Sequence, residues 1–125
     1  MKKGRVGETV DELVHKAPQV KGVRVVRHLE SEDMKHLVSL AKELIGHPKT
    51  VALLGSDEGG AKLVVARSPD VDLDCRPLVK DAMKTLGGSG GGKPDFAQGG
   101  GPDAGKLEEA LDALTEAVRK ALEKE

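Results

Sequence analysis

A glycine-rich segment near the C-terminal end places the strongest constraint on how this chain folds. Eight of the fifteen residues between positions 87 and 101 are glycine. Because glycine has no side chain to bury, the backbone of this segment must matter more than its side-chain packing. Apolar residues with helical spacing lie on both sides of it, over residues 78–86 and 107–122. The segment therefore lies between two predicted helices and needs an explanation in backbone chemistry.

The core must be built from aliphatic side chains. The chain has 125 residues, of which 38% are apolar, and Phe96 is its one aromatic residue. This length predicts one small domain, and the lack of aromatic rings limits how much area each residue can bury. Such a domain is marginally stable, which leaves open that a neighbouring domain or a second copy covers part of it.

Hydrophobic spacing predicts alternating helices and strands. The predicted helices cover residues 6–17, 31–45, 74–86 and 104–124, and the predicted strands cover 20–28, 50–55 and 61–67, with a further strand around 95–98. Ser31 and Asp74 are the predicted N-caps of the second and third helices, and Gly87 ends the third. The two apolar strands are expected to form a hairpin through the loop 56–60.

These elements predict an α/β fold, in which a small mixed β-sheet packs with helices in a single domain that ends in an amphipathic helix. We expect residues 1–18 to be a helical lead-in and residues 19–125 to form the domain that carries the glycine-rich motif.

Several classes of protein are disfavoured by what the sequence lacks. No stretch approaches the roughly 18 apolar residues that span a bilayer, and a single Cys75 cannot form an internal disulfide. We therefore expect a cytoplasmic protein without a membrane partner, in which Cys75 is a packing residue. The sequence predicts neither a metal site nor a cofactor, since the four histidines are scattered: His15, His28, His36 and His47.

Charge is distributed unevenly along a chain whose net charge is −1. Residues 1–30 carry seven Lys/Arg and four Asp/Glu, whereas residues 102–125 carry four and seven. Such asymmetry is typical of a protein with one face suited to phosphates, although chance variation of a solvated surface explains it equally well. Lys21, Arg24 and Arg27 on the predicted strand 20–28 are candidate phosphate contacts, and ordinary strand solvation is the alternative.

Three interpretations of residues 87–101 compete. A phosphate loop fits Gly87, Gly92 and Lys93, but the next position must supply a hydroxyl and is Pro94. A flexible linker fits the composition but has no need for Phe96. The third is a binding surface, where main-chain amides approach phosphate oxygens and the side chains of Lys93, Asp95 and Gln98 add polar contacts.

The segment Gly90–Gly101, GGGKPDFAQGGG, resembles the GGGRPDMAQGGG signature of the alanyl-tRNA synthetase C-terminal domain. The surrounding helices and strands occur in the family's order, so the resemblance covers about residues 20–115. Three positions depart from the family pattern. Lys93 stands where Arg is usual, Ser89 where Lys is common, and Phe96 where Met is usual. Lysine keeps the charge of arginine but loses its planar fork for bidentate phosphate contacts.

The resemblance implies a non-catalytic domain, related to the glycine-rich nucleic-acid-binding domain of Asp-His-His phosphoesterases. It implies binding to the outer corner of alanine tRNA to assist aminoacylation and editing, no small-molecule substrate, and a homodimer as a further option. An oligomerisation or structural module built on the helix 104–124 is the alternative, as is a free-standing nucleic-acid-binding protein. The predicted nucleic-acid-binding residues are Gly90, Gly91, Gly92, Lys93, Pro94, Asp95, Gln98, Gly99, Gly100, Lys21, Arg24 and Arg27.

Overall fold

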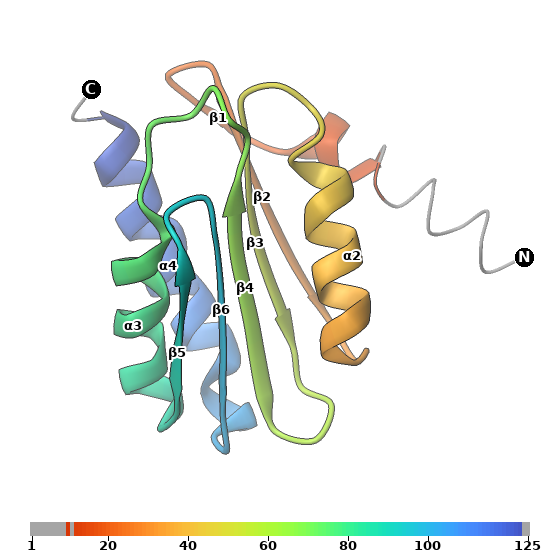
Figure 1. Ribbon diagram of the computed structural model, residues 1–125, viewed down its shortest axis with the longest axis vertical. Coiled ribbons are helices and arrows are strands. Elements are labelled where there is room, and N and C mark those ends of the chain that lie inside the picture. Colours follow the sequence, from red (N-terminus) through yellow and green to blue (C-terminus); the bar gives the residue numbers. More distant parts are fainter. Residues whose placement is uncertain (1–9, 11, 124–125) are drawn as a thin grey trace, which may run out of the picture.

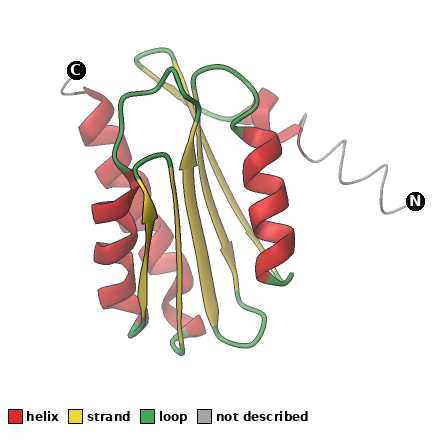
Figure 2. Cartoon of the chain, viewed as in Figure 1, coloured by secondary structure: helices red, strands yellow, loops and turns green. Residues whose placement is uncertain are grey.

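The computed structural model describes residue 10 and residues 12–123. A six-stranded sheet has helix α2 on one face and helices α3 and α4 on the other (Figures 1 and 2). The strands are β1 (Gln19–Val20), β2 (Val23–Glu30), β3 (Thr50–Ser56), β4 (Ala61–Arg67), β5 (Ser89–Lys93) and β6 (Phe96–Gly101). The helices are α2 (Met34–Leu44), α3 (Cys75–Leu86), the short 3₁₀ turn η1 (Ala104–Lys106) and α4 (Leu107–Glu123).

The sheet is mixed, in the order β1-β2-β3-β4-β6-β5. Strands β2 and β3 are parallel and are connected through α2, whereas every other neighbouring pair is antiparallel. Because β6 lies between β4 and β5, the hairpin of β5 and β6 forms one edge of the sheet. This arrangement confirms the predicted α/β class and the mixed sheet.

Two aliphatic cores lie on the two faces of the sheet. Strands β3 and β4 are buried on both, with Val51 and Leu53 in the core beneath α3 and α4 and Ala52 and Leu54 in the core beneath α2. The apolar stripe of α4 is buried within the chain: Leu107, Leu111, Leu114, Val118 and Leu122. That stripe had suggested an oligomerisation module, but its burial here accounts for it without a second copy.

The predicted strand 20–28 is wrong at its beginning, because a tight turn divides it. Lys21 and Gly22 have φ values of 54° and 81°, and Val20 pairs with Val23 across them. Positive φ at both central residues is typical of the two-residue hairpin turn that matches strand twist. Lys21 therefore lies in a turn and not in a strand.

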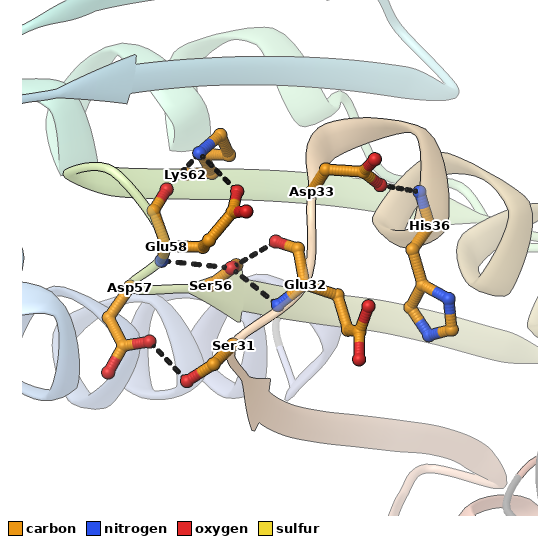
Figure 3. Close-up of polar contacts among 8 residues, drawn as sticks. All are labelled: Ser31, Glu32, Asp33, His36, Ser56, Asp57, Glu58 and Lys62. Carbon is orange, nitrogen blue, oxygen red and sulfur yellow. Dashed lines mark hydrogen bonds and ion pairs between the residues drawn. The ribbon is translucent and has the colours of Figure 1, made fainter.

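The predicted N-cap of the second helix is also wrong. Asp33, not Ser31, caps α2, and its carboxylate accepts the His36 backbone N–H at 2.9 Å (Figure 3). Ser31 instead donates its hydroxyl to Asp57 at 2.5 Å. The buried Ser56 hydroxyl accepts the Glu32 N–H at 3.1 Å, so the β2–α2 connection is tied to the end of β3.

The remaining helix predictions agree with the structure where it describes them, except that the predicted helix 104–124 begins with the 3₁₀ turn η1 before α4, and its residue 124 lies outside the described residues. Asp74 caps α3, and Gly87 ends it with φ of 71°. Residues 12–16 are helical and stop before Pro18, while residues 6–9 and 11 of the predicted helix 6–17 lie outside the described residues. Within the described part of the chain, no helix has the length and apolar character needed to cross a membrane.

Candidate nucleic-acid interface

The glycine-rich segment forms a β-hairpin and not a loop. Five residue pairs join β5 to β6, from Ser89 opposite Gly100 to Lys93 opposite Phe96. Pro94 and Asp95 make the turn between them. Positive φ occurs in this segment at Gly87 and Gly92 among the residues described. These two separated residues do not form a nest of successive amides for an anion, and regular strand geometry explains most of the glycines.

One face of the hairpin lies against α3, and there the glycines are required by packing. A Cβ atom on Gly90 would lie 2.8 Å from the Val79 side chain, and one on Gly99 would lie 2.8 Å from the Met83 sulfur. At both positions the added Cβ atom would also lie within 3 Å of backbone atoms of the paired strand, so the strands or the helix would have to move. These glycines allow α3 to lie directly on the backbone of the hairpin.

The opposite face of the hairpin is open. Because side chains alternate along a strand, Gly91 points away from α3, and a Cβ atom built on it meets nothing within 4 Å. Its φ is not positive, so neither space nor backbone conformation requires glycine at this position. Gln98, directly opposite Gly91, is exposed on the same face.

A groove of about 530 Å³ runs between this open face and α2. Helix α2 packs on β3 and β4, so β6 and β5 extend beyond it. Val38, Ile45 and Phe96 supply apolar surface to the groove, and Lys42 and Lys93 supply positive charge. The remaining lining residues are Gly91, Gly92, Asp95 and Gln98. The groove therefore combines apolar side chains, glycine backbone and cations.

The tip of the hairpin is held in place by backbone hydrogen bonds. The N–H of Cys75, the first residue of α3, donates to the Pro94 carbonyl at 2.8 Å. The N–H of Arg67, at the end of β4, donates to the Asp95 carbonyl at 3.1 Å. These two bonds fix the position of Lys93 beside the groove without using any side chain of the tip.

The charges of the groove are available to a ligand. Over the described residues, neither Lys42 nor Lys93 forms an ion pair with a carboxylate. Asp95 is the acidic side chain of the lining, so the groove carries a net positive charge. An anionic ligand with a flat apolar part matches this combination.

The described residues hold no group of three or more His, Cys, Asp or Glu side chains that could bind a metal ion. Two of the histidines instead contact one carboxylate, since His28 and His36 lie 3.0 and 3.2 Å from the Glu30 oxygens. The Cys75 thiol, at the first residue of α3, is buried in the core, and this burial raises its pKa to about 12. It is protonated at neutral pH and packs in the core, as predicted.

Residues 19–120 match the DHHA1 domain family. This match extends over most of the chain and includes the hairpin and the groove. The chain belongs to the DHHA1 domain family. An alignment of 115 residues with the alanine–tRNA ligase of Methanothrix thermoacetophila shows 43% identity and covers 89% of the chain and 13% of that protein. An alignment of 112 residues with the alanine–tRNA ligase of Bifidobacterium longum shows 39% identity and covers 84% of the chain and 12% of that protein.

The chain thus spans a small part of these relatives and is homologous to a part of them. Among solved structures, it is similar to the C-Ala domain from Aquifex aeolicus alanyl-tRNA synthetase, with a TM-score of 0.73 and 28% identity over 83% of the chain and 98% of that structure. A DHH-domain member of a family of ribosomal proteins shares the fold, with a TM-score of 0.59 and 21% identity over 94% of the chain and 31% of that structure. The family resemblance of the glycine motif is confirmed.

This DHHA1 domain does not bring all the predicted site residues together. The glycines, Lys93, Asp95 and Gln98 lie on the β5–β6 hairpin, but Arg24 and Arg27 lie on β2, beyond β6, β4 and β3. The candidate phosphate contacts on the predicted strand 20–28 therefore do not lie beside the glycine motif. Arg27 also points to the α4 face, where it forms an ion pair with Asp112.

Sequence reasoning missed the α2 side of the groove. Val38 and Ile45 fit the apolar spacing of the predicted helix 31–45, which indicates core residues, yet they are only half-buried and line the groove with Lys42. Their spacing places all three on one side of α2. No signal within the helix distinguishes these residues from core residues, because the groove arises from the order of strands beside it.

Proposed function

We propose that this DHHA1 domain is a non-catalytic tRNA-binding module of an alanine–tRNA ligase, and that the groove between α2 and the β5–β6 hairpin contacts the outer corner of the tRNA. By holding the corner, the domain helps to present the acceptor end to aminoacylation and editing sites in other domains. The homology to alanine–tRNA ligases and the chemistry of the groove support this proposal.

The observation that carries the proposal is the open space at Gly91. The protein itself would accept a methyl group there, whereas Gly90, one residue earlier, has no room for one. A glycine that internal packing does not require leaves the backbone open to a closely approaching ligand, and at Gly91 that opening faces the groove. The ligand would then lie flat on the glycine strands.

The chemistry of the groove fits folded RNA. The apolar surface of Val38, Ile45 and Phe96 suits the flat face of a base pair that is exposed where stacked helices end, as at a corner. Lys42 and Lys93 suit the neighbouring phosphates, and Gln98 suits a phosphate or a 2′-hydroxyl. This mode of contact needs only one aromatic residue, and the chain has one in Phe96.

The Gly91→Ala variant tests the proposal directly. The fold should gain stability, by about 0.4–1 kcal/mol, because alanine restricts the unfolded chain and fits the native backbone. Binding of a folded alanine tRNA transcript, measured by fluorescence anisotropy with the 125-residue chain, should weaken by roughly tenfold, or about 1.4 kcal/mol.

Gly105→Ala is the matched control. Gly105 also has open space around its position and no positive φ, but it lies in η1, away from the groove. It should gain similar stability and bind the transcript as the parent chain does. Unchanged binding by the Gly91→Ala variant, or equal losses in both variants, would contradict the proposal.

A further inference from the structure

We propose a second contact for the phosphate backbone of the bound RNA, formed by the β1–β2 turn and the loop between α2 and β3. Lys21, Arg24 and Lys49 carry it, and we call these three residues the rim cations. The inference rests on the proposed function, because it concerns a second segment of the RNA held in the groove.

Arg24 and Lys49 line a depression of about 330 Å³ together with Gln19, Gly22, Pro48 and Asp70, and Lys21 lies between Gln19 and Gly22 in the sequence. The Arg24 N–H donates to the Lys49 carbonyl at 2.7 Å, which joins the two segments. The Asp70 carboxylate accepts the Lys49 N–H at 3.0 Å and is the acid of this lining. Over the described residues, none of the rim cations forms an ion pair, so their charges remain available.

Two of the rim cations stand where the backbone favours other residues. Lys21 and Lys49 have φ of 54° and 50°, and they are the non-glycine residues with positive φ in the described part of the chain. Glycine and asparagine adopt this left-handed conformation most readily. Since the turns do not call for lysine, the charge itself is a reason for these residues.

The second contact lies on the same side of the sheet as the groove and at the same end. Arg24 pairs with Thr50 at the beginning of β3, and Lys93 pairs with Phe96 at the beginning of β6. Both Arg24 and Lys93 belong to the α2 face. Four strand-to-strand steps separate β2 from β5, or about 19 Å at roughly 4.8 Å a step. One phosphate cannot reach both places, so the two contacts together need several nucleotides of folded RNA.

The structure also separates Arg27 from the rim cations. Although it is three residues from Arg24, it points to the opposite face of the sheet and pairs with Asp112 of α4. Arg27→Ala is therefore a matched control that removes a nearby positive charge without touching the proposed contact.

The test replaces Lys21 and Lys49 together by asparagine in the full chain. Asparagine tolerates the left-handed backbone, and Lys21→Asn creates the Asn-Gly pair that two-residue hairpin turns favour, so the fold should be retained. Circular dichroism and urea unfolding would verify the fold. At low salt, affinity for the folded alanine tRNA transcript should fall by roughly five- to twentyfold, and the slope of log K against log salt should become shallower by about 1–2. Arg27→Ala should bind as the parent chain does.

The Asp70→Asn variant gives a prediction of opposite sign. The amide oxygen can still accept the Lys49 N–H, but a negative charge is lost, so affinity should rise by roughly two- to fivefold at low salt. The second contact is overturned if the double variant binds like the parent while Lys93→Ala binds more weakly, which would leave the proposed function intact. If neither change alters binding, or if the parent chain does not bind the transcript, the proposed function fails as well.

Discussion

The two long hairpins of this domain are neighbours in one sheet but are built on opposite principles. Strands β3 and β4 carry large aliphatic side chains that are buried on both faces. Strands β5 and β6 carry mainly glycine, with α3 resting directly on one face and a groove on the other. In the first hairpin side chains fill the space between layers, whereas in the second the absence of side chains brings a helix close on one face and leaves room for a ligand on the other.

This difference implies that substitutions in the two hairpins fail for different reasons. In β3–β4, removal of side-chain atoms leaves a cavity. In β5–β6, addition of atoms produces a clash beneath α3 but reaches only open space above the groove. Stability and binding should therefore separate between positions that are adjacent in sequence.

The largest loss of stability should follow Leu53→Ala in β3. Leu53 is fully buried in the core beneath α3 and α4. Truncation of a buried leucine removes transfer free energy and leaves a cavity, which costs about 2–5 kcal/mol. Urea unfolding followed by circular dichroism would measure it. A loss well below this range would mean that the layers collapse into the space, and that the side chains of β3 do not determine their separation.

Local signals in the sequence were sufficient for β3, β4 and α3. The apolar runs of the two strands and the residues at the two ends of α3, Asp74 and Gly87, gave the observed positions closely. Strand β5 was missed because Ser89–Lys93 has almost no side chains with a preference for strands. The turn at Lys21 was missed because valines on both sides predict one continuous strand.

The candidate site was only partly predictable, for a physical reason. The glycine motif identified the hairpin, but the groove also needs Val38 and Ile45, which have the same helical spacing as core residues. Their exposure depends on α2 packing over β3 and β4 and leaving β6 and β5 uncovered. That depends on the strand order, which brings residues distant in sequence together, and spacing within α2 does not encode it.

A smaller loss should follow Gly90→Ala in β5. The added methyl group would lie 2.7 Å from the Gln98 carbonyl oxygen and 2.8 Å from the Val79 side chain. Overpacking of this kind costs about 1–3 kcal/mol. The same urea experiment should then give opposite signs for Gly90→Ala and Gly91→Ala. Equal effects would contradict the assignment of the two glycines to different faces.

Alkaline pH should lower the free energy of unfolding through the buried thiol of Cys75, by a smaller amount than the Gly90→Ala change. Burial raises the pKa of the Cys75 thiol to about 12, from 9.0 in its ordinary state. The thiol's contribution to stability is complete below pH 9 and is lost as the pH rises towards 12, because the unfolded chain ionises first. The slope above pH 9 is at most about 1.4 kcal/mol per pH unit for one proton. Cys75→Ala should unfold with a flatter pH dependence than the parent chain over pH 9–10.5. Parallel pH profiles would mean that the thiol is accessible to water.

The smallest effect on stability, but a clear effect on binding, should come from Lys42→Ala. Lys42 lies in the last turn of α2, and Lys84 occupies the same position in α3, so each interacts with the negative end of its own helix dipole. Loss of that interaction costs about 0.3–1 kcal/mol at an exposed site in both variants, and Lys84→Ala also removes an exposed ion pair with Asp81, which contributes little. Only Lys42 lines the groove. Its removal should weaken tRNA binding and make the salt slope shallower by about 0.7–0.9, the value for one phosphate contact, whereas Lys84→Ala should leave the slope unchanged. If both variants change the slope equally, the general charge of the domain attracts the RNA, and the groove has no special part in binding.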